Sequence, residues 1–322
     1  MPAYRRERIA TPDGDFLDLD WVSESKTAQT APAPRASGVS PWPLEAATDR
    51  GDEAPLVVLF HGLEGSSASH YARALMHAVA DRGWHGVVVH FRGCSGEPNR
   101  LARAYHSGDS AEIAWVLDHL AKGYARLYAV GVSLGGNALL KYLGEQGSQA
   151  KPHAAAAISV PYDLAAANAM LSQGMGLLYS RHFLRSLIPR TLAKARCFPG
   201  QVGLDRLTTL NAARTLRDFD DAVTAPPHGF AGADDYYAKS SCAQYLQGIT
   251  VPTLLLHAAN DPFLPPSAIP RAEQLPACVR LALSAQGGHV GFVSGSLPGH
   301  LDWLPQRLLA HLGQYESNNR VA

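Results

Sequence analysis

The pentapeptide Gly131-Val132-Ser133-Leu134-Gly135 directly follows the apolar run 127–130 and precedes a helical pattern. A serine on a tight turn between a strand and a helix is held in a strained conformation. Gly131 and Gly135 permit that turn, because side chains at these positions would collide. The turn also lies at a helix N-terminus, where backbone N–H groups favour developing negative charge. The pentapeptide alone is common by chance, but this context predicts that Ser133 is a nucleophile.

A serine hydroxyl is a weak nucleophile near neutral pH, so it needs a base within hydrogen-bond reach and a carboxylate that orients the base. When the nucleophile lies on a strand-to-helix turn of this kind, the three residues are expected to follow one another along the chain in the order serine, acid, histidine. Asp261 follows the apolar run Thr253–His257, and a loop at the carboxyl end of a strand suits a catalytic acid. His289 lies among glycines soon after the run Val279–Leu283. The predicted catalytic residues are therefore Ser133, Asp261 and His289.

Other residues could take the same roles. Asp163 follows the preceding apolar run and could be the acid in place of Asp261. His300 is a weaker candidate for the base, at the edge of the last predicted helix. Asp261 could also be a plain Asp-Pro turn, and His289 a packing or surface histidine.

Acyl transfer also requires hydrogen-bond donors aimed at the oxyanion of the tetrahedral intermediate. The segment His61-Gly62-Leu63 directly follows the apolar run Leu56–Phe60, which is the right place for one donor. The backbone N–H groups of Leu63 and Leu134 are the predicted donors. His61 is expected to brace this loop as a hydrogen-bonded structural histidine.

The elements that must position these residues alternate between short apolar runs and helical patterns, which predicts a mostly parallel sheet flanked by helices. The predicted strands are Leu56–Phe60, Gly86–Phe91, Arg126–Gly131, Ala154–Val160, Thr253–His257 and Val279–Leu283. Short continuous apolar strands of this kind are typical of buried parallel sheets. The sequence thus predicts an α/β-hydrolase fold, with residues 1–322 forming a single domain.

Three segments depart from this alternation. Residues Arg8–Val22 predict an N-terminal antiparallel hairpin around the turn Pro12-Asp13-Gly14. Residues 23–54 are rich in Ala, Pro, Ser and Thr, which predicts a flexible surface excursion. Between residues 163 and 248 two strands that should be neighbours are separated by amphipathic pieces such as Met175–Leu187, which predicts a helical lid over the carboxyl ends of the strands.

Composition excludes several classes of function. Lys plus Arg (28) equal Asp plus Glu (28), so no overall field favours nucleic acid as a partner. The four cysteines lie far apart and the histidines are scattered, which argues against a metal site and a disulfide scaffold. No signal peptide or transmembrane segment is visible, and we expect a cytoplasmic protein. No cofactor is expected, and the oligomeric state is left open.

Several further blocks of the sequence stand out along the chain. They are His61–Ser66, His90–Arg100, Tyr105–Gly108, Ser133–Asn137, Phe219–Asp221, His228–Phe230, Asp235–Tyr237, Asp261–Phe263 and Gly287–Phe292. Together they resemble the YheT-like branch of the α/β hydrolases, a family of predicted esterases related to eukaryotic phospholipases and yeast medium-chain acyltransferases, over about Thr11 to Trp303. The resemblance implies that Ser133, Asp261 and His289 form the triad, and it favours Asp261 over Asp163. For Arg92 and Glu97 we expect a structural role, in which they brace loops around the pocket.

The predicted activity is hydrolysis of a carboxylic ester with a short- to medium-chain acyl group through an acyl-enzyme. The substrate is a small or lipid-like ester. The same triad could instead serve an acyltransferase, a thioesterase or a phospholipase-type lipid hydrolase, because acceptors other than water can intercept an acyl-enzyme. A non-catalytic binding protein on this fold is a third possibility, against which the full set of serine, aspartate and histidine argues.

Overall fold

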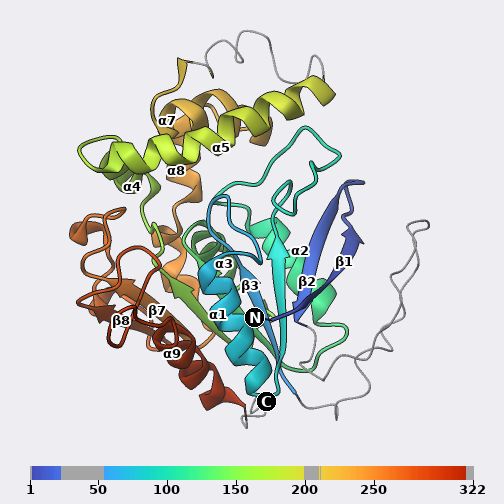
Figure 1. Ribbon diagram of the computed structural model, residues 1–322, viewed down its shortest axis with the longest axis vertical. Helices are drawn as coiled ribbons and strands as arrows, with labels where there is room; N and C mark the ends of the chain where they lie inside the picture. Colours follow the sequence, from blue (N-terminus) through green and yellow to red (C-terminus); the bar gives the residue numbers. More distant parts are fainter. Residues whose placement is uncertain (1, 23–53, 199–209, 211, 317–322) are drawn as a thin grey trace.

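A twisted sheet runs through the centre of the protein, with helices on both faces (Figure 1). The structure is a computed structural model that describes residues 2–22, 54–198, 210 and 212–316. Except for Ala54, the predicted surface excursion 23–54 lies outside the described residues. In those described residues eight strands form the sheet. In spatial order they are β1 (Tyr4–Ala10), β2 (Phe16–Val22), β4 (His85–His90), β3 (Leu56–Phe60), β5 (Leu127–Val132), β6 (Ala154–Ile158), β7 (Thr253–Ala258) and β8 (Val279–Ser284).

The six strands from β4 to β8 in this order are parallel to one another. β1 and β2 form an antiparallel hairpin, and β2 also pairs antiparallel with β4. Together with the helices on both faces, this confirms the predicted fold class. For these six parallel strands the predicted ends lie within two residues of the observed ones, and Leu56–Phe60 matches at both ends. The remaining differences arise because apolar runs report burial and not the hydrogen-bond register.

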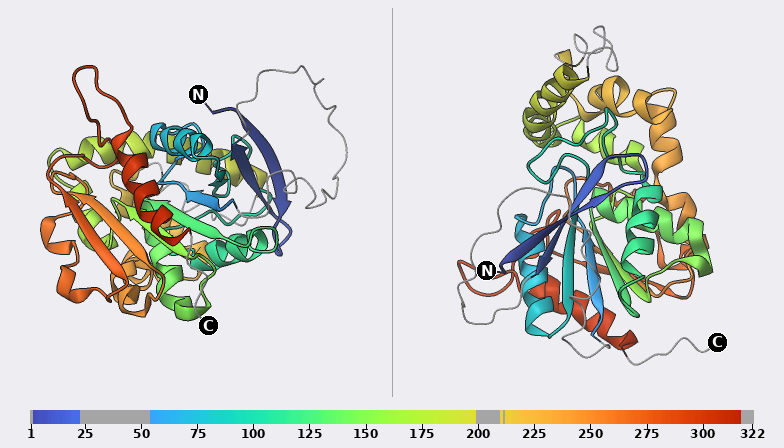
Figure 2. Two further views of the ribbon diagram at one scale, coloured as in Figure 1. Left: turned by 90° about the horizontal axis from the view of Figure 1, so that it is seen from below. Right: turned by 90° about the vertical axis from the view of Figure 1, so that its right-hand side faces the viewer.

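Side-chain alternation along the strands divides the core into two layers. On β3, Leu56, Val58 and Phe60 belong to one core cluster, and Val57 and Leu59 belong to the other. Because successive side chains point to opposite faces, a strand that is apolar throughout needs a helical layer on each side. Helices α2 (Ser110–Leu120) and α3 (Leu134–Gln146) cover the first face, and α1 (His70–Asp81) and α9 (Trp303–Leu312) cover the second. Figure 2 shows these layers from two further sides.

The N-terminal hairpin is longer than predicted because its first strand is charged. β1 begins at Tyr4, four residues before the predicted start, and places Arg6 opposite Asp20 and Arg8 opposite Asp18. Each arginine forms a two-pronged ion pair with its partner, at N–O distances of 2.7 to 2.9 Å. Both carboxylates are buried. Cross-strand ion pairing, and not apolar alternation, therefore defines this strand.

Between β6 and β7 the chain forms a helical insertion that lies over the end of the sheet toward which the parallel strands point (Figure 1). Its α-helices are α4 (Leu164–Leu171), α5 (Gly176–Cys197), α7 (Leu216–Phe219) and α8 (Ala233–Ser240), with a π-helical turn at Asp220–Thr224 and 3-10 turns at Pro226–His228 and Cys242–Gly248. Further 3-10 turns lie at Gly147–Gln149, Pro266–Ala268, Ala272–Gln274 and Gly313–Tyr315. No helix of the described residues is long and apolar enough to cross a membrane.

Helix α5 is the longest element of the insertion and continues past the predicted piece 175–187. It passes through Pro189, although an internal proline removes one helix hydrogen bond. Contacts beyond the proline offset that loss. Arg190 pairs with Glu64 at 2.6 Å, and Lys194 donates to Asn99 Oδ1 at 2.7 Å. These contacts attach the second half of α5 to loops of the sheet core.

Candidate active site

Ser133 lies on the turn between β5 and α3 in a conformation that non-glycine residues rarely adopt, with φ 53° and ψ −118°. The flanking glycines are required by close packing. A Cβ on Gly131 would lie 2.6 Å from the Cα of Gly136, and one on Gly135 would lie 2.4 Å from the carbonyl oxygen of Phe60. Backbone strain of this kind is found where it holds a functional side chain in place.

The structure brings Ser133, His289 and Asp261 within hydrogen-bond distance of one another. His289 Nε2 lies 2.9 Å from Ser133 Oγ, and His289 Nδ1 lies 2.9 Å from Asp261 Oδ2 and 3.1 Å from Oδ1. Asp261 is buried and also accepts the backbone N–H of Phe263 at 2.9 Å. A carboxylate in this position orients Nδ1–H toward itself, which leaves Nε2 free to accept the serine proton.

The two competing candidates lie elsewhere. Asp163 caps α4, and its side chain accepts the N–H of Ala166 at 3.0 Å. His300 is exposed and faces Asp302 at 3.1 Å. Both residues thus have structural contacts of their own, and neither contacts Ser133 or His289 within the described part of the chain.

The predicted oxyanion donors lie at the same site. Leu63 and Leu134 line the cavity that contains Ser133 and His289. Leu134 is the first residue of α3, so its N–H has no partner inside the helix. Among the described residues, no protein acceptor contacts the N–H of Leu63 or of Leu134. Both groups are therefore available to a ligand.

His61 braces the loop that carries Leu63. Its Nδ1–H donates to the carbonyl of Gly62 at 2.7 Å, and its Nε2 accepts the N–H of Phe91 at 3.1 Å. Complete burial lowers the pKa of His61 to about 3, so the ring is neutral and has one donor and one acceptor nitrogen. On the far side of the loop, Gly62 N–H donates to the hydroxyl of Tyr71.

A cavity of about 690 Å³ extends from Ser133 and His289 beneath the insertion. Part of its wall is apolar and combines α5 with neighbouring segments. The residues of this apolar wall are Leu171, Phe183, Leu187, Leu216, Phe219 and Phe263. Phe263 also stacks on the ring of His289, with centroids 4.1 Å apart. An acyl chain attached at Ser133 would thus have an apolar surface beside it.

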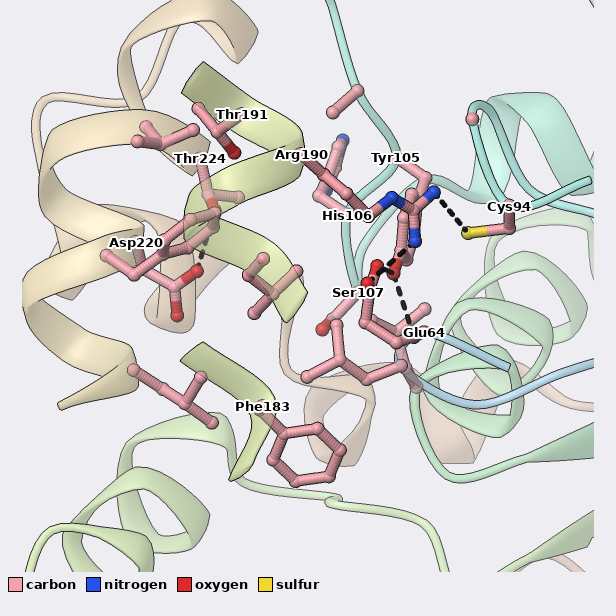
Figure 3. Close-up of a pocket in the computed structure, with 18 of the residues that line it drawn as sticks. Glu64, Cys94, Tyr105, His106, Ser107, Phe183, Arg190, Thr191, Asp220 and Thr224 are labelled. Carbon is pink, nitrogen blue, oxygen red and sulfur yellow. Dashed lines mark hydrogen bonds and ion pairs between the residues drawn. The ribbon is translucent and has the colours of Figure 1, made fainter. Parts of the chain in front are cut away.

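The other part of the wall is polar and is shown in Figure 3. Arg190 points from α5 to Glu64, which also accepts the hydroxyl of Tyr105 at 3.0 Å. Burial raises the pKa of the neighbouring Cys94 thiol to about 12, so this cysteine is not a competing nucleophile. Burial also raises the pKa of Asp220 to about 6, against hydrogen bonds from Thr224 and Tyr237. The sequence pattern did not single out Glu64 or Arg190 as part of the site, because α5 brings Arg190 there from a distant segment.

The block after β4 serves a structural role around the cavity. Arg92 is buried and lies 2.9 Å from Asp15 and 2.5 Å from Glu112. Glu97 pairs with Arg8 of the hairpin at 2.9 Å. The pairs with Asp15 and Arg8 connect one wall of the cavity to the N-terminal hairpin, and the pair with Glu112 connects it to α2. These contacts are in line with the bracing role expected of Arg92 and Glu97.

Comparison with known proteins defines the class. Residues 55–296 match the family model described as alpha/beta hydrolase fold, and the chain is an α/β hydrolase. Solved structures with this fold include a Pyrococcus furiosus esterase (16% identity, TM-score 0.55, 98% of this chain and 90% of that one). Another is Est1E of Butyrivibrio proteoclasticus with bound ferulic acid (13% identity, TM-score 0.58, 98% and 100%).

Sequence relatives define the branch. The chain is 40% identical over 311 residues to Escherichia coli (strain K12) YheT, an esterase by name, with 96% of this chain and 84% of that protein covered. It is 33% identical over 300 residues to mouse Phospholipase ABHD3, covering 92% and 68%. The protein therefore belongs to the YheT-like family of α/β hydrolases, as the motif resemblance predicted.

Proposed function

We propose that the protein is a serine hydrolase that cleaves carboxylic esters, with Ser133 as nucleophile, His289 as general base and Asp261 as the residue that orients His289. The observation that carries this proposal is the 2.9 Å separation of His289 Nε2 from Ser133 Oγ, with Asp261 on the opposite ring nitrogen. This is the arrangement that removes a serine proton as the oxygen attacks a carbonyl.

In the proposed reaction the ester carbonyl lies between Ser133 Oγ and the N–H groups of Leu63 and Leu134. These amides stabilise the tetrahedral oxyanion, for which loss of one donor costs about 3–4 kcal/mol in comparable sites. His289 then protonates the leaving alcohol. Water, activated by the same histidine, attacks the acyl-enzyme and releases the acid.

The choice of an ester rests on the cavity and on the relatives. The apolar wall suits a short- to medium-chain acyl group. YheT is an esterase by name and the mouse relative a phospholipase, and both names describe cleavage of an ester bond. In this proposal the insertion between Leu164 and Gly248 acts as a lid that covers the acyl group.

The proposal is tested by turnover of p-nitrophenyl butyrate in wild type and in Ser133→Ala. The expected loss is at least roughly 10⁴-fold in kcat. Asp163→Asn serves as a control, because asparagine also caps helices and the mutated side chain lies outside the site. Unchanged turnover in Ser133→Ala, or a loss in Asp163→Asn as large as in Asp261→Asn, contradicts the proposal.

A further inference from the structure

A second histidine, His257, lies close to Asp261. It is the fifth residue of β7, and Asp261 follows four residues later on the loop after that strand. His257 Nε2 lies 3.5 Å from Asp261 Oδ2, the same oxygen that lies 2.9 Å from His289 Nδ1. One carboxylate oxygen of Asp261 thus lies near a nitrogen of each of two imidazole rings.

The packing around His257 gives no reason for a polar residue at this position. The residue is fully buried, and neither ring nitrogen has a hydrogen-bond partner among the described residues. The buried hydroxyl of Tyr162 also lacks one there, and its ring lies 6.0 Å from that of His257. A buried polar group without a hydrogen bond costs free energy, and on a buried strand an aliphatic residue avoids that cost. The Asp261 carboxylate lies 3.5 Å from one of these ring nitrogens, Nε2.

The protonation state of His257 follows from its surroundings. Burial lowers the pKa of His257 most strongly, His289 lowers it further, and Asp261 opposes both. The ring of Tyr162 lies 6.0 Å from that of His257, and its hydroxyl stays protonated because burial raises its pKa. His257 is therefore a neutral imidazole with one N–H, and the tautomer with the proton on Nε2 directs it at the carboxylate.

Asp261 keeps acceptor capacity for that proton, because each of its oxygens has two lone pairs. Oδ1 accepts the N–H of Phe263 at 2.9 Å, and Oδ2 accepts Nδ1–H of His289. His257 Nε2 lies 3.5 Å from Oδ2. Hydrogen bonds of catalytic groups are often long in unliganded sites and shorten when the substrate complex forms, so 3.5 Å is within reach of such a bond.

We propose that His257 is a positioning residue for the triad, with its Nε2–H directed at Asp261 Oδ2 so that the carboxylate cannot rotate away from His289. The inference rests on the proposed function, because it needs Asp261 to orient the catalytic base. A neutral donor fits this role better than a cation, since it leaves the negative charge of Asp261 available to the imidazolium that His289 becomes.

The test compares three substitutions at His257. In His257→Gln the amide NH₂ reaches about as far as Nε2, whereas the shorter side chain in His257→Asn does not, and His257→Leu has no donor. The expected kcat for p-nitrophenyl butyrate falls roughly tenfold in Leu and Asn variants and stays within about threefold in Gln, with KM nearly unchanged in all. Without the donor the carboxylate attracts the His289 proton more strongly. In the plot of kcat/KM against pH, the acid limb should therefore shift to higher pH by about half a pH unit in the Leu and Asn variants.

The controls separate positioning from packing. His311 is also buried and contacts the Ala155 carbonyl at 3.0 Å, away from the site, so His311→Leu should leave kcat and the acid limb unchanged. If His257→Leu does not fold, the Gln and Asn variants decide alone. Equal kcat and equal acid limbs in His257→Gln and His257→Asn overturn the inference, while the proposed function stands as long as Ser133→Ala is inactive. Turnover retained in Ser133→Ala overturns the proposed function itself.

Discussion

The ring of Phe263 lies against the ring of His289, with centroids 4.1 Å apart and planes inclined by 30°. Phe263 also contacts Tyr179 and Phe183 of α5, at centroid distances of 4.8 and 6.1 Å. One aromatic side chain therefore connects the proposed base to the insertion. The same ring borders the cavity. A substrate that displaces α5 would therefore also shift Phe263 and the position of the His289 ring.

We predict that Phe263→Leu lowers kcat by a factor of about 2 to 10, because an aromatic pair contributes about 0.5–1.5 kcal/mol beyond its buried area. The measurement is turnover of p-nitrophenyl butyrate under saturating conditions. Trp115→Leu is a matched control, since Trp115 stacks on His119 with centroids 5.9 Å apart on α2 and does not border the cavity. Equal losses in both variants would show that the Phe263 contact has no specific effect on His289.

Acyl length should depend on Leu187, which lies on the apolar wall of the cavity. A tryptophan there fills space that a longer acyl chain needs. In Leu187→Trp, kcat/KM for p-nitrophenyl octanoate should fall at least tenfold and that for the acetate should stay within about threefold. Leu178→Trp is the control, because Leu178 is on the same helix but 55% exposed. A uniform loss over all chain lengths in Leu187→Trp would contradict an acyl site at this wall.

The turn between β5 and α3 that carries Ser133 should tolerate almost no side chain at Gly135. A Cβ there would lie 2.4 and 2.5 Å from the backbone oxygens of Phe60 and His61. Moving these backbone atoms to relieve the clash costs much more free energy than moving a side chain. Gly135→Ala should lower the free energy of unfolding by about 3 kcal/mol, measured by urea denaturation. Gly136→Ala should cost less, because its closest contact, at 2.7 Å, is a methyl group of Val160. The opposite order would contradict the packing described.

Acid should weaken the N-terminal hairpin through Asp20. Burial by itself would raise the pKa of Asp20, but hydrogen bonds from Arg6, His90 and Ser67 outweigh it and hold the pKa well below the usual range. A lowered folded-state pKa adds stability above the unfolded-state pKa of about 4, and this stability is lost as the pH falls further.

Asp20→Asn should therefore lower the free energy of unfolding by about 3 kcal/mol at pH 7, and the difference from wild type should shrink at pH 3. Urea denaturation at both pH values measures this. Asp81→Asn, at an exposed position, should have little effect at either. A difference for Asp20→Asn that does not depend on pH would contradict the role of the ionised carboxylate.

The fold class and the residues of the candidate site could be predicted from sequence, because local signals carry both. Ser133 lies between a buried strand and a helix, and Asp261 and His289 follow strands whose carboxyl ends meet at one edge. The sequence predicts β1 too short, because charged residues such as Arg6 and Arg8 do not look like strand residues in the sequence. Their ion-pair partners, Asp20 and Asp18, lie on the paired strand and become visible only in the structure. Contacts between distant segments, such as Arg190 with Glu64, have no local signature.

His257 shows a second limit of the sequence. On an apolar strand a histidine has the same pattern as a core residue, and only the fold reveals that its Nε2 lies 3.5 Å from the Asp261 carboxylate. The short distance depends on the backbone path after β7, which no spacing rule specifies.

The central claim is that Ser133 is the activated nucleophile, and mass spectrometry after treatment with a fluorophosphonate probe tests it most directly. The account predicts a single phosphonylated peptide that contains Ser133, slower labelling in Asp261→Asn, and no labelling in Ser133→Ala. Labelling of another serine in the wild type, or undiminished labelling in folded Ser133→Ala, would contradict it.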